Sequence, residues 1–332
     1  MYKLLGLCLT FSTLLALATF LSLCSTLFWR VSGKLFGGLS ASARANLVFW
    51  LRFVPIAFSV VLVVFFLVPS YVLDEPKDSG EIVTVKFATA SLISIAGLIL
   101  AAWRGFESWK LTVGLQKRWM HDATRVTVES VSIPTYCIEH AFPVVAVVGS
   151  IRPKLFIARK VIDSLSREEL AATLAHEAGH MIARDNLKRQ LLRACRDVLT
   201  VIPCGRLLDR EWSEASEAAA DEHAAQAGRT IALDLAASLV KIARMVPPGT
   251  TPISAVGSLL IGDNMSAIAW RVRRLTELAS LETIERRHRN SLLQIGLLSV
   301  IALAGLILLA PHYREILLLV HNMTESIVLL LQ

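Results

Sequence analysis

Charged residues are scarce in this chain, since Asp, Glu, Lys and Arg make up only 18% of its 332 residues. Soluble globular domains average about 25%. Hydrophobic residues account for 54% of the chain, and its mean hydropathy is +0.57. A composition this apolar excludes an ordinary soluble protein and predicts segments that cross a membrane.

Cysteine is sparse as well, and the sequence has neither an internal repeat nor a low-complexity segment. The cysteines are scattered, with no Cys-x-x-Cys pair, at Cys8, Cys24, Cys137, Cys195 and Cys204. Unpaired thiols are typical of a reducing compartment such as the cytoplasm. The central segment, residues 104–290, has the size of a single domain.

Long apolar segments predict four transmembrane helices, at about residues 4–29, 47–73, 82–103 and 291–311. The first contains no charge and is too long for the hydrophobic core of a signal peptide, so it is expected to be retained. Arg52 is the charged residue of the second segment and lies near its start, where it is expected to reach the membrane surface. A transporter function is therefore not favoured.

The charges that flank these segments predict their orientation. The first loop is basic, the second is acidic, and both ends of residues 104–290 are basic. Positively charged flanks stay in the cytoplasm. We therefore expect residues 104–290 to lie on the cytoplasmic side of a bacterial cytoplasmic membrane, with the N-terminus on the outer side. The net charge of +7 follows from this topology and from contact with the lipid bilayer, and nothing indicates nucleic-acid binding. Residues 312–332 predict a short amphipathic helix on the outer leaflet or against the bundle.

A His-Glu-x-x-His motif lies in the central segment, formed by His176, Glu177 and His180. On a helix, residues four apart share a face, so the two imidazoles can bind one zinc ion. Glu177 then reaches a water molecule on the metal and acts as the general base of a hydrolytic reaction. The sequence Ser166-Arg-Glu-Glu169 is a capping box that predicts where this helix starts.

A third zinc ligand is available in Glu217-Ala-Ala-Ala-Asp221, which lies in a predicted helix over residues 212–226. Glu217 would complete a His-His-Glu site for one zinc ion per chain, with a fourth position open for substrate. The three alanines would let this helix pack closely against the histidine helix. Asp221 is placed to accept a hydrogen bond from the far nitrogen of a ligating imidazole. The alternative is an ordinary solvated acidic face.

The remaining elements of the central segment are predicted from periodicity and turn residues. A small sheet is expected from strands at residues 125–133, 143–148 and 154–158. Further helices are expected at residues 186–199, 231–245 with Thr230 as its cap, and 265–280.

The chain resembles integral-membrane zinc metallopeptidases of the BlaR/MecR type and, more distantly, HtpX-like proteases and CAAX prenyl proteases. The resemblance is carried by three stretches, residues 174–187, which run from the zinc motif to Arg184-Asp185-Asn186-Leu187, residues 148–157, and Glu217 with Asp221. It implies an α-helical membrane protein with four transmembrane helices and an α+β gluzincin-like zinc metallopeptidase domain. It also implies that residues 143–148 pair with an extended substrate, although a buried strand is an equal alternative.

Two further residues keep alternative interpretations. Arg271 resembles a late arginine of these proteases and is a candidate transition-state stabiliser, but it also fits an exposed arginine on a basic helix. Asp185 is expected to end or brace the active helix rather than to bind metal.

Three functional hypotheses follow. The first is a membrane-anchored zinc endopeptidase that cleaves a cytosolic regulatory protein such as a repressor. The second is an HtpX-like quality-control protease that acts on damaged membrane proteins. The third is a non-catalytic receptor or scaffold that keeps zinc for structure, which Glu177 argues against, because a structural site does not require a base. BlaR/MecR sensors carry a large extracellular domain after their fourth span, and we expect none here, so a signal would have to arrive by another route.

Overall fold

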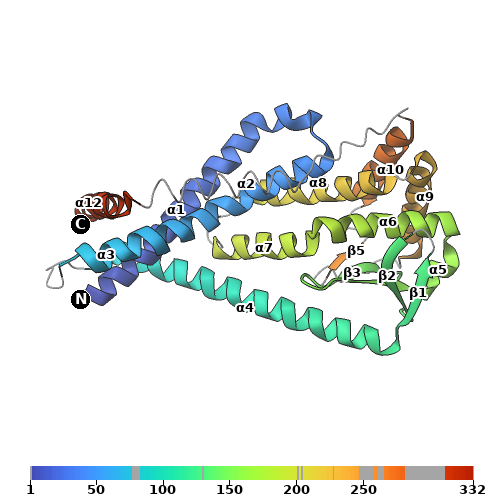
Figure 1. Cartoon of the computed structure of the whole chain (residues 1–332), viewed down its shortest axis with the longest axis horizontal. Helices are drawn as coiled ribbons and strands as arrows, with labels where there is room; N and C mark the ends of the chain where they lie inside the picture. The colour runs from blue at the N-terminus through green and yellow to red at the C-terminus, as the bar shows by residue number, and fades with distance from the viewer. Residues whose placement is uncertain are drawn as a thin grey trace.

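The computed structural model describes residues 2–76, 83–128, 131–199, 202, 205–226, 228–246, 257–259, 265–280 and 311–331. It is mostly helical, with one small mixed sheet (Figure 1). Almost all of the predicted fourth span, residues 291–310, lies outside the described residues.

Three helical segments of the described chain are long and apolar enough to cross a membrane, at Tyr2–Gly38, Ala41–Asp74 and Val85–Asp122. They consist of α1 (Tyr2–Ser32) with η1 (Gly33–Gly38), α2 (Ala41–Leu62) with η2 (Val63–Leu67) and α3 (Val68–Asp74), and α4 (Val85–Asp122). The first two predicted spans lie within the first two segments, and the third lies in α4 from Val85 onward. These three segments are called the bundle below. The helix α4 continues past residue 103 and leads from the bundle to the sheet (Figure 1).

The π-helical turn η2 ends two residues before Pro69, which lies in the first turn of α3. Proline has no N–H and crowds the carbonyl four residues earlier, so a helix that continues through proline must widen or kink. That carbonyl belongs to Phe65, and it accepts a hydrogen bond of 2.6 Å from the Tyr313 hydroxyl. Tyr313 begins α12 (Tyr313–Leu331), which packs on η2 and α3 at the end of the bundle farthest from the sheet (Figure 1).

The sheet has the strand order β1-β2-β4-β3-β5. Its strands are β1 (Thr124–Val128), β2 (Val131–Ile138), β3 (Val145–Val148), β4 (Lys154–Ala158) and β5 (Gly257–Leu259). Neighbours are antiparallel except β2 and β4, which are parallel. The single strand predicted at residues 125–133 is wrong, because that stretch contributes to two strands of a hairpin. The strand β5 was not predicted.

Helices α5 (Arg159–Ser164), α6 (Arg167–Ala183), α7 (Asp185–Val198), α8 (Arg206–Ala225), α9 (Arg229–Met245) and α10 (Met265–Ser280) complete the described chain. The capping box is confirmed, since the Glu169 N–H donates to the Ser166 hydroxyl and the Ser166 N–H donates to the Glu169 carboxylate. The helix α8 begins six residues earlier than predicted, and Gly228 rather than Thr230 occupies the cap of α9.

The helix α8 lies along the second apolar helix, α2, and runs antiparallel to it (Figure 1). Three polar contacts join them: Arg52 to Asp209 at 3.1 Å, Arg44 to Glu211 at 2.6 Å, and the Ala41 N–H to Glu222 at 3.1 Å. The expectation that Arg52 reaches the membrane surface is wrong, because α8 covers it and leaves it 1% exposed. A Cβ atom at Gly205, where φ is +96°, would lie 2.5 Å from the Arg52 Nε, so glycine is required there.

The helix α7 packs in a similar way on α4, where Arg104 pairs with Asp197 at 2.7 Å. The helices that follow the histidine motif are therefore packed on the apolar helices rather than held apart from them. This arrangement brings the candidate site close to the bundle.

Candidate metal centre

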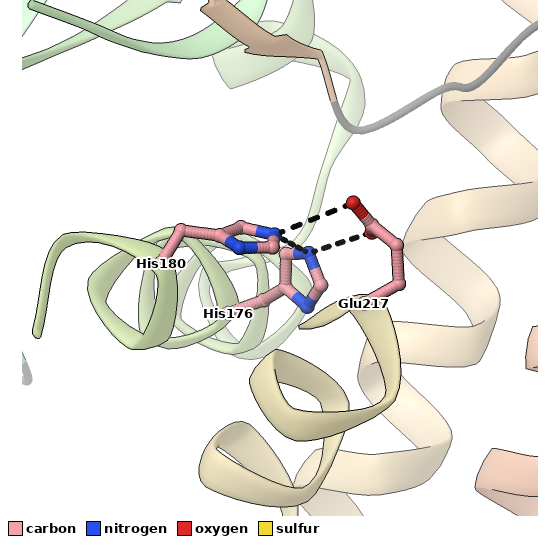
Figure 2. A group of neighbouring side chains, drawn as sticks. All are labelled: His176, His180 and Glu217. Atoms are coloured by element: carbon pink, nitrogen blue, oxygen red, sulfur yellow. Dashed lines mark hydrogen bonds and ion pairs between the residues drawn. The ribbon is translucent and has the colours of Figure 1, made fainter. Parts of the chain in front are cut away.

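Three side chains from α6 and α8 face one another (Figure 2). The Nε2 atoms of His176 and His180 are 3.2 Å apart. Each of them is also 3.7 Å from a different carboxylate oxygen of Glu217. One ligand atom from each residue lies within 4.8 Å of the others. Two imidazole nitrogens and a carboxylate at this spacing fit one zinc ion.

Close packing of α6 on α8 makes this meeting possible. A Cβ atom added at Gly179, one residue before His180, would lie 3.1 Å from the Ala220 Cα and 3.3 Å from the His223 Cβ. Both are closer than ordinary van der Waals contact, so a larger residue at either Gly179 or Ala220 would push the helices apart. The small residues between Glu217 and Asp221 thus bring both carboxylates to the histidines.

A carboxylate contacts the far nitrogen of each imidazole. The Nδ1 of His176 is 2.9 Å from Asp221, as the spacing of α8 predicts, and the Nδ1 of His180 is 2.7 Å from Asp185. Such contacts fix the tautomer and ring orientation of a ligating histidine. The sequence predicted that Asp185 ends or braces the active helix, but it did not predict the contact with His180. Asp185 reaches His180 because Arg184 adopts the left-handed conformation, with φ of 54°, which turns the chain between α6 and α7.

Arg271 lies inside this cluster and is only 5% exposed, so its interpretation as an exposed arginine is wrong. Its Nε and Nη2 donate to the two oxygens of Asp221 at 3.0 and 2.6 Å. Its Nη1 is 3.1 Å from Glu217. The Arg271 guanidinium on α10 therefore holds the carboxylates of Glu217 and Asp221 in place. The sequence pattern around Arg271 was the signal that could indicate a role in the site. The burial of Arg271 could not be predicted from it, because that burial depends on how α10 packs.

The charges of the cluster set its protonation states. Burial, with the neighbouring Arg271, lowers the pKa of His176 and favours the neutral imidazole that binds metals. Burial also opposes a charge on His180, but Glu217 and Asp185 outweigh it and raise the His180 pKa to about 10. In the absence of a metal ion, a proton on His180 thus supplies positive charge to the site.

The carboxylates of Glu217 and Asp221 are ionised at neutral pH. Burial works against their charge, but His180 and Arg271 hold the pKa of Glu217 well below its usual range. Arg271 and His176 likewise lower the pKa of Asp221 to about 2. An ionised Glu217 beside two imidazoles is the form that a cation requires.

Glu177 is completely buried, and neither of its carboxylate oxygens has a hydrogen-bond partner among the described residues. Burial raises the pKa of this carboxyl to about 8. Leaving a buried carboxyl unpaired costs folding free energy, so such groups are usually explained by an interaction that function requires. A metal cation beside Glu177 would favour its ionised form, which is the form that acts as a base. The unpaired oxygens therefore support the fit of a metal ion here.

Residues 143–148, expected to pair with a substrate or to be a buried strand, form β3 from Val145 onward. This strand is buried and pairs with β4 on one side and β5 on the other. Both of its edges are occupied in this structure, which agrees with the second interpretation.

Replacing either Asp185 or Asp221 by Asn should weaken zinc binding by about 10- to 100-fold, as loss of an outer-shell partner does. The amide can present an N–H to the imidazole nitrogen, which disfavours the metal-binding tautomer. Competition with a chelator measures the affinity, and Asp163→Asn on the exposed surface of α5 is the control. Affinities equal to the wild type in both variants would remove these residues from the metal centre.

Comparison with known families supports this chemistry. Residues 141–208 match the model of Peptidase family M48, whose metallopeptidases are typically zinc-dependent. The matched segment contains His176, Glu177 and His180 and ends before Glu217. Comparison with curated proteins gives no match. With three helices apolar enough to cross a membrane, the M48 match supports a membrane-associated metallopeptidase that acts on protein or peptide substrates.

Proposed function

We propose that this protein is a membrane-anchored zinc endopeptidase. His176, His180 and Glu217 bind one zinc ion, and Glu177 is the general base. The observation that carries the proposal is that two buried imidazole nitrogens and the half-buried Glu217 carboxylate lie together beside the unpaired carboxyl of Glu177. A purely structural zinc site would gain nothing from an unpaired buried carboxyl at this position.

A zinc ion bound here would polarise the scissile carbonyl and acidify a water molecule. Glu177 takes the proton from the attacking water and delivers it to the leaving amine. Asp221 and Asp185 keep the imidazoles of His176 and His180 in the orientation that binds metal. Arg271 pairs with both Glu217 and Asp221. These contacts favour a role in positioning the two carboxylates over direct stabilisation of the transition state.

The substrates that fit best are protein segments at the membrane surface. The helix α8, which carries Glu217, lies along the apolar helix α2 and is joined to it by Arg52, Arg44 and Ala41. A site built on such a helix is more accessible to chains held at the membrane than to folded proteins in solution. The basic flanks of residues 104–290 support a position of this site on the cytoplasmic side of a bacterial inner membrane. Cleavage of damaged membrane proteins, as by HtpX-like proteases, is therefore the role we propose.

A comparison of newly formed protein N-termini tests this role in cells that express the wild type or Glu177→Gln. We expect new ends in several membrane proteins, near their cytoplasmic surfaces, only with the wild type. New ends confined to one cytosolic repressor would support the signalling role instead. Identical sets of ends in both strains would argue against a protease that is active under those conditions and would favour a scaffold.

A further inference from the structure

A second group of potential metal ligands lies at the end of the bundle farthest from the sheet. It consists of Glu75, at the C-terminal end of α3, and His321 and Glu325 on α12 (Figure 1). His321 and Glu325 are four residues apart and share one helix face, the spacing that also pairs His176 with His180. One ligand atom from each of the three lies within 4.8 Å of the others. The group has no residue in common with the catalytic cluster.

The three side chains line a partly open cavity rather than a flat surface. They line a cavity of about 10 Å³, together with Leu5, Leu9, Leu67, Ser70, Tyr71 and Thr324. This is about the volume that a single water molecule or ion requires. The side chains of Glu75 and His321 are only 7% and 14% exposed, whereas that of Glu325 is 47% exposed. Two carboxylates thus converge with one imidazole on a small, mostly buried space with an open side at Glu325.

The distances fit ligands better than hydrogen bonds. His321 Nδ1 is 3.8 Å from Glu75, and His321 Nε2 is 3.5 Å from Glu325. Both exceed the usual N–H···O length of about 2.7–3.2 Å. They resemble the 3.7 Å separations between Glu217 and its two histidines. The contacts involve different ring nitrogens, so the imidazole would have to turn until one nitrogen lies between the two carboxylates.

We propose that Glu75, His321 and Glu325 bind a second divalent transition-metal ion of the Zn²⁺ class. One imidazole and two carboxylates are a donor set that such ions accept, and water can supply the remaining ligand on the side of Glu325. The ion would fasten α12 to the C-terminal end of α3.

The surrounding contacts make this a prepared site, because they already hold α12 in place without the ion. Arg314 pairs with Asp74 through two bonds of 2.5 and 2.9 Å. The Ser70 hydroxyl donates to the Leu317 carbonyl at 3.0 Å, and Tyr313 donates to Phe65. The backbone that carries the three ligands is therefore ordered in advance, which lowers the entropic cost of binding.

Metal counting on the purified full-length protein tests the proposal. The protein is stripped with a chelator, reloaded with Zn²⁺ and desalted, and the zinc per chain is measured. We expect one ion fewer in Glu325→Gln and in His321→Asn than in the wild type. The control is His312→Asn, since His312 forms a similar but exposed pair with Glu315 on the same stretch of chain. Glu325→Gln alters a half-exposed side chain, so loss of the fold should not interfere.

A second background separates this site from the catalytic one. In a protein that carries His176→Asn and His180→Asn, we expect one bound ion to remain and to disappear when Glu325→Gln is added. A count that Glu325→Gln and His321→Asn leave unchanged would overturn the second site and leave only side-chain contacts between His321 and the two carboxylates. Loss of the catalytic ion alone would bear only on the proposed peptidase function.

Discussion

Replacing Glu177 by Gln should reduce peptide hydrolysis by about 100- to 10,000-fold, the range that general acid–base catalysis contributes. Glutamine keeps the size of the side chain but cannot accept a proton from water. Because Glu177 is not among the three proposed ligands, the zinc content should stay the same. Turnover of an unfolded protein substrate and zinc per chain, measured on the same preparation, check both outcomes. The matched control is Glu168→Gln on the exposed side of α6.

The stability of the metal-free variant shows whether lost activity reflects lost structure. The folded-state pKa of Glu177 is about 8, above the ordinary value of 4.5, so the fold favours the protonated carboxyl. Ionising this buried carboxyl therefore destabilises the folded state. The free energy of unfolding falls as the pH rises from 4.5 to about 8 and stays constant above that. Glutamine avoids this cost. We expect the variant to have a higher Tm than the wild type in chelator above pH 8, with a difference that shrinks as the pH falls. A lower Tm at every pH would attribute the lost activity to misfolding, and retained activity would remove Glu177 from the mechanism.

Replacing Glu217 by Gln should weaken zinc binding by more than about 100-fold, the upper range for loss of an outer-shell partner, because a direct ligand is lost. The neutral amide also removes the negative charge that faces His176 and His180. Zinc per chain after dialysis and the affinity in chelator competition measure the effect. The matched control is Glu214→Gln, one turn earlier on α8, where the side chain is exposed and pairs with Arg210.

This second prediction tests whether Glu217 on α8 is a ligand of the metal ion that His176 and His180 on α6 bind. Zinc binding unchanged in Glu217→Gln would mean that the third ligand lies elsewhere. A loss of zinc in Glu214→Gln as well would indicate that α8 itself is perturbed. A loss in Glu217→Gln alone, with an unchanged Tm of the metal-free protein, would support its role as a ligand.

Several features could be predicted from sequence because they depend on neighbours along the chain. Long apolar runs predicted the three helices that contain residues 4–29, 47–73 and, from Val85 onward, 82–103. The capping box predicted the start of α6, because both of its hydrogen bonds lie within four residues. The spacing of Glu217 and Asp221 predicted that they share a face of α8.

Other predictions failed where packing between distant segments decides the outcome. Arg52 was expected at the membrane surface and Arg271 was compatible with an exposed position, yet both are buried against carboxylates of α8. The stretch at residues 125–133 has the alternating pattern of one strand, but it contributes to the two antiparallel strands β1 and β2. The alternation continues across the hairpin, so the pattern alone does not reveal where the chain reverses.

By itself, then, the sequence determined the apolar helices, the histidine helix and the two pairs of metal-site residues on their respective helix faces. Helical period, capping and hydropathy are local properties, and each can be evaluated within a few turns of the chain. Only the tertiary structure decided that Glu217 meets His176 and His180, that the turn at Arg184 brings Asp185 to His180, and that α12 brings His321 to Glu75. These contacts join separate elements, and their geometry depends on close approaches such as Gly179 to Ala220 that no local period encodes.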